Sequence, residues 1–228
     1  MLYAYLSGRM GYAVADKEYR SAQVRVGDFC FFAGAPDAVV AAWQPEKTRP
    51  YTVFIPHTRD WDALIEQAYP QARRSVRYAF RKCNAFDTER LRGFATALPA
   101  GYALRRMDEA LYRQAAQQEW SRDLVSQYPT WECYAAHGAG YAVLQDGVLV
   151  CGASSYADWP GGIEIEIDTH PAHRRRGLAR ACAAALMLDC LARGLHPSWD
   201  AANPVSAHLA QTLGYLPAGA YPVYEWLR

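Results

Sequence analysis

An alternating strand that leads directly into an arginine-rich helix start constrains this chain more than any other segment. Within residues 161–180, three isoleucines alternate with Glu164, Glu166 and Asp168. A period of two predicts a strand with one apolar face and one face lined by carboxylates. Pro171 ends this strand. A helix rich in alanine and leucine is then expected over residues 176–193, with Gly194 as its C-terminal cap.

The start of this helix has the chemistry of an anion site. Three consecutive arginines, Arg174, Arg175 and Arg176, precede Gly177. The first turn of a helix leaves backbone N–H groups unpaired, and the helix dipole makes that end positive. Gly177 has no side chain to block a phosphate, and Ala179 keeps the next turn small. The segment therefore predicts a binding site for a polyphosphate.

Two common phosphate motifs do not fit this segment. A Walker loop requires Lys-Ser or Lys-Thr after its second glycine, and the dinucleotide fingerprint requires three spaced glycines. Instead, Arg174, Gly177 and Ala179 resemble the Arg/Gln-x-x-Gly-x-Gly/Ala signature of the GNAT N-acetyltransferase superfamily. A second segment matches the asparagine, helix and Leu-Gly-aromatic corner of that superfamily, with Trp199, Asn203, Ser206, Leu213, Gly214 and Tyr215 in order.

Composition describes an ordinary globular chain. The 228 residues are 51% hydrophobic and 21% charged, enough for one large domain or two small ones. A net charge of +1 argues against nucleic acid or a membrane as partner, and the apolar runs are shorter than the ~20 residues of a membrane span. The N-terminus lacks the pattern of a secretion signal. Six cysteines without C-x-x-C spacing, Cys182 and Cys190 among them, favour buried free thiols and a reducing cytoplasm.

Residues 1–98 are predicted to form a separate α/β unit. Strands are expected at 11–16, 21–26, 28–33, 51–55 and 78–80, and helices at 38–43, 61–69 and 87–98. Asp60 is the expected N-cap of the second of these helices. Pro99 marks the junction. This unit is either unrelated to the rest of the chain or a degenerate copy of the same fold.

Residues 99–228 are predicted to contain a strand, two helices, three antiparallel strands, a helix, a strand, a helix and a closing pair of strands. That order resembles the GNAT fold, an α/β (α+β) architecture with a mixed, mostly antiparallel twisted sheet flanked by helices. The sequences of residues 165–179 and 198–215, together with the N-terminal α/β extension, resemble those of the subfamily that contains zwittermicin A-resistance acetyltransferases.

The resemblance implies acetyl-CoA as co-substrate and no metal. In this superfamily the strand before the phosphate loop splays from its neighbour at a bulge, and pantetheine fills the gap. Asn203 is expected either to reach the pantetheine arm or to cap the last helix, or to do both, with Ser206 one turn further on. The residues expected to contact the co-substrate are Ile167, Asp168, Thr169, Arg174, Arg175, Arg176, Gly177, Leu178, Ala179, Arg180, Asn203 and Ser206.

For catalysis, the resemblance implies that Glu166 or Glu164 removes the proton of an amine whose pKa is ~10.4. An N–H near Ile167 would polarise the thioester carbonyl. Many members carry a tyrosine as proton donor seven residues after the asparagine, and this chain has Ala210 there. The replacements considered for that donor are Ser206, Tyr215, Tyr221 and Tyr224.

The expected function is N-acetyl transfer from acetyl-CoA to a primary amine of a small molecule, by direct transfer in a ternary complex. Ala210 leaves one alternative open, a non-catalytic acyl-CoA-binding or regulatory module. A basic run at residues 73–82 leaves a second, weaker alternative, a nucleic-acid-binding protein, although such a run more often forms a solvent-exposed face. His170 and His173 are expected to serve the loop rather than a metal. The N-terminal unit is a lid, a dimerisation surface or half of the acceptor cleft, and a homodimer remains open.

Overall fold

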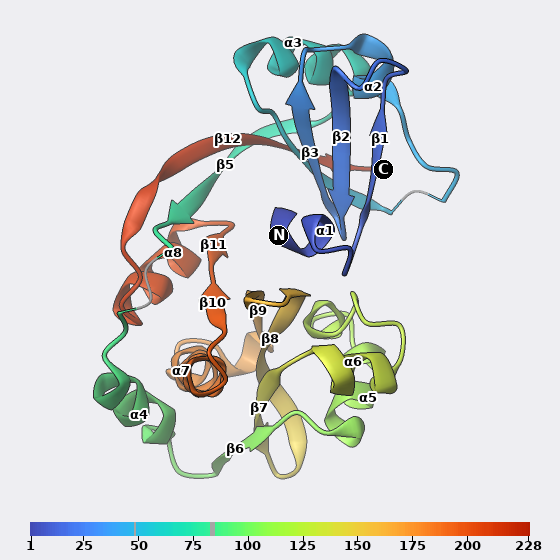
Figure 1. Ribbon diagram of the computed structural model, residues 1–228. Coiled ribbons are helices and arrows are strands. Elements are labelled where there is room, and N and C mark those ends of the chain that lie inside the picture. Colours follow the sequence, from blue (N-terminus) through green and yellow to red (C-terminus); the bar gives the residue numbers. More distant parts are fainter. Residues whose placement is uncertain (48, 83–84) are drawn as a thin grey trace. The chain divides into compact units, whose positions relative to one another are not determined.

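A computed structural model describes residues 1–47, 49–82 and 85–228 and divides the chain into two compact units (Figure 1). Unit 1 comprises Met1–Tyr78 and Gly219–Arg228, and unit 2 comprises Ala79–Ala218. The structure thus places the division earlier than residues 98/99. The helix α4 (Thr88–Thr96) belongs to unit 2, because it packs along α7 (Leu178–Ala192). None of the helices in the described part of the chain is long and apolar enough to cross a membrane.

Unit 1 is a mixed sheet covered by short helices. Its strands lie in the order β1-β2-β3-β4-β12-β5. Their neighbours in sequence are the helices α1, α2 and α3. The bounds are α1 (Leu2–Leu6), β1 (Tyr12–Ala15), β2 (Ser21–Val26), β3 (Phe29–Gly34), α2 (Ala38–Ala42), β4 (Tyr51–Ile55), α3 (Arg59–Ala68), β5 (Arg73–Phe80) and β12 (Pro217–Leu227).

Three expectations for these elements were wrong. The helix α3 has Thr58 as its N-cap instead of Asp60, which falls in the first turn, where its carboxylate faces the positive end of the helix dipole. The strand β5 starts at Arg73 and not at residue 78; its charged first residues are exposed, and Arg73 pairs with Glu225 of β12. The chain end forms one long strand, β12, where a closing pair was expected; its residues from Gly219 onward belong to unit 1.

Aromatic side chains form the core of unit 1. Trp61 and Phe54 are fully buried, and the Phe54 ring lies 4.4 Å from the ring of Tyr69. Tyr224 from β12 belongs to the same cluster, since β12 pairs antiparallel with β4 and places Tyr224 opposite Phe54. The core of unit 1 therefore depends on residues from both ends of the chain.

The basic run of residues 73–82 does not form a uniform charged face. Arg73 pairs with Glu225, and Arg77 is buried with its guanidinium carbon 4.9 Å from the centroid of the Phe29 ring. Lys82 bonds to the hydroxyl of Ser198. These side chains serve internal contacts.

Unit 2 contains a second sheet, with the strand order β10-β9-β8-β7-β6. In Figure 1, α7 lies along one side of this sheet and α5 and α6 along the other. The expected order of elements from residue 101 to α8 is present. The bounds are β6 (Tyr102–Arg106), α5 (Glu109–Gln117), the 3₁₀ helix η1 (Arg122–Leu124), α6 (Trp131–His137), β7 (Gly140–Gln145), β8 (Val148–Trp159), β9 (Gly162–Thr169), η2 (Pro171–His173), α7, β10 (His196–Ser198), β11 (Asp200–Ala201) and α8 (Pro204–Thr212).

Local signals in the sequence account for most of these boundaries. Asp108 caps α5 by accepting from the Leu111 N–H, and Thr130 caps α6 by accepting from the Cys133 N–H. Asp146 and Gly147 both adopt positive φ, as a tight hairpin turn requires, and join β7 to β8.

The strand β9 has an open edge. It pairs in parallel with β10 only over Gly162–Glu164, and its remaining residues, 165–169, have no partner on the β10 side in the described chain. On the other side it pairs with β8 up to Thr169. A register shift falls between Ser155 and Ala157, so the extra residue of the bulge is on β8 and not on β9. The two strands β9 and β10 thus separate immediately beyond this bulge.

The two units repeat one succession of elements. In unit 1, β1, β2 and β3 are antiparallel, α2 follows, and β4 returns parallel to β3. In unit 2, β7, β8 and β9 are antiparallel, α7 follows, and β10 returns parallel to β9. The strand β3 pairs with β4 only over Phe29–Phe31. Beyond that stretch, the buried Trp61 indole donates to the Gly34 carbonyl at 3.3 Å.

The described cysteines are free thiols. Cys30, Cys151, Cys182 and Cys190 are buried, as expected for the last two, while Cys133 is half-buried. Burial raises the pKa of the Cys30 and Cys190 thiols to about 12. Cys83 lies outside the described residues.

Candidate active site

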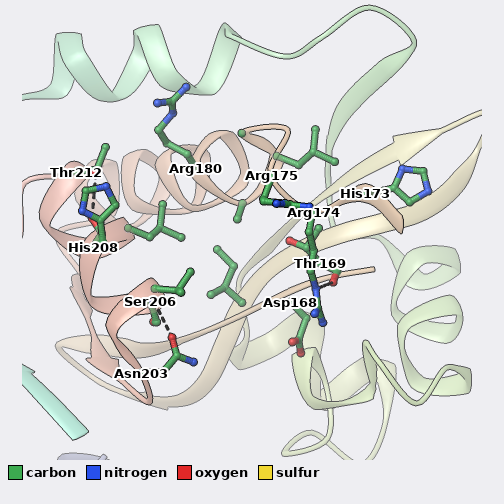
Figure 2. A pocket seen from close by; sticks show the side chains of 16 residues that line it. Asp168, Thr169, His173, Arg174, Arg175, Arg180, Asn203, Ser206, His208 and Thr212 are labelled. Carbon is green, nitrogen blue, oxygen red and sulfur yellow. Dashed lines mark hydrogen bonds between the residues drawn. The ribbon is translucent and has the colours of Figure 1, made fainter. Parts of the chain in front are cut away.

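A cavity of about 830 Å³ opens at the place where β9 and β10 separate (Figure 2). Three segments of unit 2 enclose it: the end of β9, the loop leading into α7, and one side of α8. Nearly all residues predicted to bind the co-substrate line it. The lining consists of Ile167, Asp168, Thr169, His173, Arg174, Arg175, Gly177, Leu178, Ala179, Arg180, Asn203, Val205, Ser206, His208, Leu209 and Thr212.

The loop before α7 has the backbone conformation of an anion-binding turn. The 3₁₀ helix η2 follows β9, and α7 starts at Leu178, two residues later than expected. The delay arises because Arg175 and Gly177 take left-handed backbone conformations, with φ of 62° and 78°. Left-handed residues within a turn direct successive N–H groups into one concavity, which favours anions. The helix dipole of α7 adds to this preference.

The arginines of this loop differ in what they contact. The Arg174 Nε donates to the Thr169 carbonyl at 3.2 Å, and Arg175 also lines the cavity. Arg176 does not: its guanidinium donates to the Tyr102 hydroxyl at 2.9 Å and to the Ala172 carbonyl. Only the backbone of Arg176 therefore remains as a candidate contact for a phosphate.

Asn203 caps α8. Its Oδ1 accepts from the Ser206 N–H at 2.9 Å (Figure 2). Pro204 occupies the first helical position. The capping interpretation is therefore confirmed, and the side chain also lines the cavity. The Ser206 hydroxyl accepts from the Trp199 Nε1 at 3.1 Å, so its own proton is free to be donated.

The two glutamates predicted to act as bases lie deeper in the sheet. Glu166 is half-buried, and its Oε1 accepts from the N–H of Ile167, a cavity residue, at 3.2 Å. Glu164 is buried opposite Ser198 of β10, and neither glutamate is among the residues that line the cavity. Of the two carboxylates, that of Glu166 lies closer to the open edge of β9.

Asp168 was expected only to contact the co-substrate, but its carboxylate is also a titratable group beside the cavity. The pKa of Asp168 is raised to about 6, mainly by burial; the charge of Asp123 contributes to the rise and that of Arg174 opposes it. Asp123 comes from η1, which covers this face, since a side chain at Gly152, opposite Asp168, would meet Leu124 of η1. Because Asp168 alternates with Glu166 and Glu164 along β9, the sequence already indicated that the three side chains lie on the same face of this strand.

The tyrosines proposed as proton donors are engaged elsewhere. Tyr224 is buried in unit 1, where its hydroxyl donates to Glu66 at 2.7 Å, so the structure argues against its catalytic role. Tyr215 is buried and donates to the Pro197 carbonyl at 2.6 Å. Tyr221 belongs to unit 1 and does not line the cavity. Ser206 is the one donor candidate named from sequence that the cavity contains.

The histidines of the loop contact one another and nearby aromatic rings. The His170 and His173 rings meet edge to face at 5.5 Å, and the His173 Nδ1 lies 3.0 Å from the Tyr102 hydroxyl. Among the described residues, no group of three or more His, Cys, Asp or Glu side chains is arranged to hold a metal ion.

Comparison with known proteins gives concordant matches. The family model described as GNAT acetyltransferase matches residues 1–224. The uncharacterized N-acetyltransferase YdfB of Bacillus subtilis (strain 168) is 31% identical over 135 residues, which are 56% of this chain; the chain spans only about half (49%) of that relative. A GCN5-related N-acetyltransferase-like protein from Streptococcus suis has a crystal structure with a TM-score of 0.91 and 40% identity, covering 97% of this chain and 90% of that one.

A more distant structure resembles this chain in fold alone. It is a tandem GNAT protein from the clavulanic acid biosynthesis pathway, with a TM-score of 0.55 and 13% identity, covering 95% of this chain and 83% of that chain. The likeness extends over both units of this chain.

Proposed function

Because the chain belongs to the GNAT acetyltransferase family and is an acyltransferase, we propose that it transfers the acetyl group of acetyl-CoA to a primary amine of a small molecule. One observation carries this proposal: the open edge of β9 leads, within a single cavity, to the arginine-lined loop with its two left-handed residues. An extended pantetheine arm pairs with a free strand edge, and a pyrophosphate suits a loop of inward N–H groups.

The residues around the cavity support a direct transfer in a ternary complex. Glu166 takes a proton from the acceptor ammonium, so that the amine nitrogen attacks the thioester carbon. The Ile167 N–H, which holds the Glu166 carboxylate in the free protein, donates to the thioester oxygen instead and releases that carboxylate. The new C–N bond forms, the nitrogen releases its second proton to solvent, and the C–S bond breaks. The departing thiolate takes a proton from the Ser206 hydroxyl, which solvent reprotonates.

The acceptor is proposed to be cationic before reaction. Glu164, Glu166 and Asp168 occupy alternate positions of β9, and Asp123 lies close enough to Asp168 to raise its pKa. This concentration of carboxylates favours a positively charged amine over a neutral or acidic acceptor. The free thiols support the cytoplasm as the proposed location.

Unit 1 is proposed to be a degenerate copy of the same fold that binds no acetyl-CoA. The repeated succession of elements and the likeness to a tandem GNAT protein support the duplication. Trp61 fills the gap of unit 1 that corresponds to the cavity beside β9, and Asp37, an acidic cap of α2, follows β3 where the arginines follow β9. Calorimetry should therefore give one acetyl-CoA per chain.

A binding and turnover experiment tests the proposed function. Calorimetry measures acetyl-CoA affinity, and release of free CoA is followed with a panel of primary amines. Glu166→Gln is expected to leave affinity unchanged and to lower kcat by roughly 10²–10⁴-fold, since it cannot accept the proton. Glu109→Gln is the matched control, because Glu109 is a partly exposed residue of α5 that pairs with Arg113, outside the cavity. Tight binding without turnover for any amine would instead indicate an acyl-CoA-binding module.

A further inference from the structure

Two arginines share one aromatic ring beside the candidate active site. The guanidinium carbon of Arg180 lies 4.8 Å from the Phe94 ring centroid, and that of Arg90 lies 5.4 Å from it. Arg90 and Phe94 are one turn apart on α4, whereas Arg180 comes from the start of α7 and lines the cavity. In Figure 2, Arg180 extends from α7 toward the pale green helix α4.

These cations have no acidic neighbour within ion-pair distance in the described part of the chain. Elsewhere in unit 2, Arg105, Arg113 and Arg193 each pair with a carboxylate. For Arg90 and Arg180, the contact is the π-face of Phe94, which attracts cations without neutralising them. Two like charges held on one ring repel each other, and an anion between them would relieve that repulsion.

The position of Arg180 relates this pair to the phosphate loop. Its Nη2 would lie 3.6 Å from a side-chain carbon at Gly177, so the guanidinium sits between the loop and α4. The loop before α7 and the side chain of Arg180 both line the cavity, and the guanidinium of Arg180 also contacts Phe94. A ligand with two separate phosphate groups could use both features at once.

We propose that Arg90 and Arg180 bind the 3′-phosphate of CoA, with Phe94 as the positioning residue that holds both guanidiniums. This inference rests on the proposed function, in which the loop before α7 receives the pyrophosphate. The 3′-phosphate is a monoester of nearly two negative charges, and guanidinium groups bind such oxygens through paired, charge-assisted hydrogen bonds. The helix α4 thereby makes the chain selective for CoA over its 3′-dephospho form.

The experiment compares CoA with 3′-dephospho-CoA, two ligands that differ only in this phosphate. Calorimetry on the full chain should show that CoA binds at least about tenfold more tightly than 3′-dephospho-CoA, because one charge-assisted hydrogen bond contributes about that much affinity. Arg90→Ala and Arg180→Ala should each reduce that ratio several-fold, and Phe94→Leu should reduce it while preserving apolar packing. Arg92→Ala is the matched control, since Arg92 lies on α4 and bonds to Thr88.

The affinity for 3′-dephospho-CoA separates the outcomes. If the variants bind it as the parent protein does, they are folded, and their loss is specific to the 3′-phosphate. Equal affinity of the parent protein for both ligands would overturn this inference and leave the proposed function intact. Failure to bind either ligand would overturn the proposed function, and this inference with it.

Discussion

Gly177 is constrained by its backbone and not by the space around it. A side-chain carbon at this position would meet only the Arg180 Nη2, at 3.6 Å, which is an ordinary contact. Its φ of 78°, however, lies in the left-handed region that residues with a side chain rarely adopt. The motif glycine therefore shapes the loop that presents N–H groups to the cavity, where sequence reasoning had assigned it the role of leaving room for a phosphate.

Gly177→Ala is therefore expected to cost about 1 kcal/mol of unfolding free energy and to weaken acetyl-CoA binding several-fold, because alanine resists this conformation. Asparagine tolerates it, so Gly177→Asn should retain most of the stability and affinity despite its larger side chain. Denaturant unfolding and calorimetry measure the two effects. If Asn were as harmful as Ala, crowding and not backbone strain would be the cause.

Asp168 predicts a specific pH dependence of stability. Because burial raises its pKa from 3.8 to about 6, the folded protein holds this proton more tightly than the unfolded chain. Its contribution to stability is therefore lost as the pH rises from about 4 to about 6. Asp168→Asn should be more stable than the parent at pH 7, with the difference shrinking toward pH 4. Thermal unfolding at several pH values measures it; a constant difference would refute the assignment.

At the scale of elements, helix α8 combines a structural and a binding role in its first residue. Asn203 caps the helix with its Oδ1 and lines the cavity. Asn203→Ala should cost about 1 kcal/mol of unfolding free energy, whereas Asn203→Ser keeps a capping oxygen, adds no charge and loses the amide donor. If acetyl-CoA affinity falls in both variants but stability falls only in the alanine variant, the amide contacts the co-substrate. Unchanged affinity in both variants would limit Asn203 to capping.

The elements of unit 2 were largely predictable because their signals are local. Asp108, Thr130 and the Asp146-Gly147 turn set boundaries through hydrogen bonds and backbone conformations within a few residues. The start of α7 was placed too early, since the left-handed conformation of Arg175 has no signature in its side chain. For the candidate site, the cavity residues were found by motif, but the environment of Asp168 depends on η1, which is distant in sequence.

At the scale of the whole molecule, the long strand β12 was not predictable. The Tyr-rich segment from residue 215 onward suggested a closing pair of strands. Whether such a segment turns or continues depends on a partner, and that partner is β4, more than 160 residues earlier. Contacts of this range leave no local pattern. The same insertion brings Tyr224 into the core of unit 1.

Removing residues 219–228 is therefore expected to unfold unit 1, because the truncation deletes a strand that lies between β4 and β5 and the buried Tyr224 side chain. Near-ultraviolet circular dichroism and limited proteolysis should show loss of structure in residues 1–78. The substitution Leu227→Ser is the control, since Leu227 is an exposed residue of the same strand. A truncated chain that kept a protected unit 1 would contradict this dependence.

The place of β12 in unit 1 also has a consequence for biosynthesis. During translation, Met1–Tyr78 is synthesised before Ala79–Ala218, and it cannot pair with β12 until that segment has been translated. Translation of Ala79–Ala218 takes on the order of 10 s at usual elongation rates. During that interval, the edges of β4 and β5 that later pair with β12 are exposed. Unit 1 therefore begins to be synthesised before unit 2 but completes its fold after it, and we expect nascent-chain chaperones to bind unit 1 during this interval.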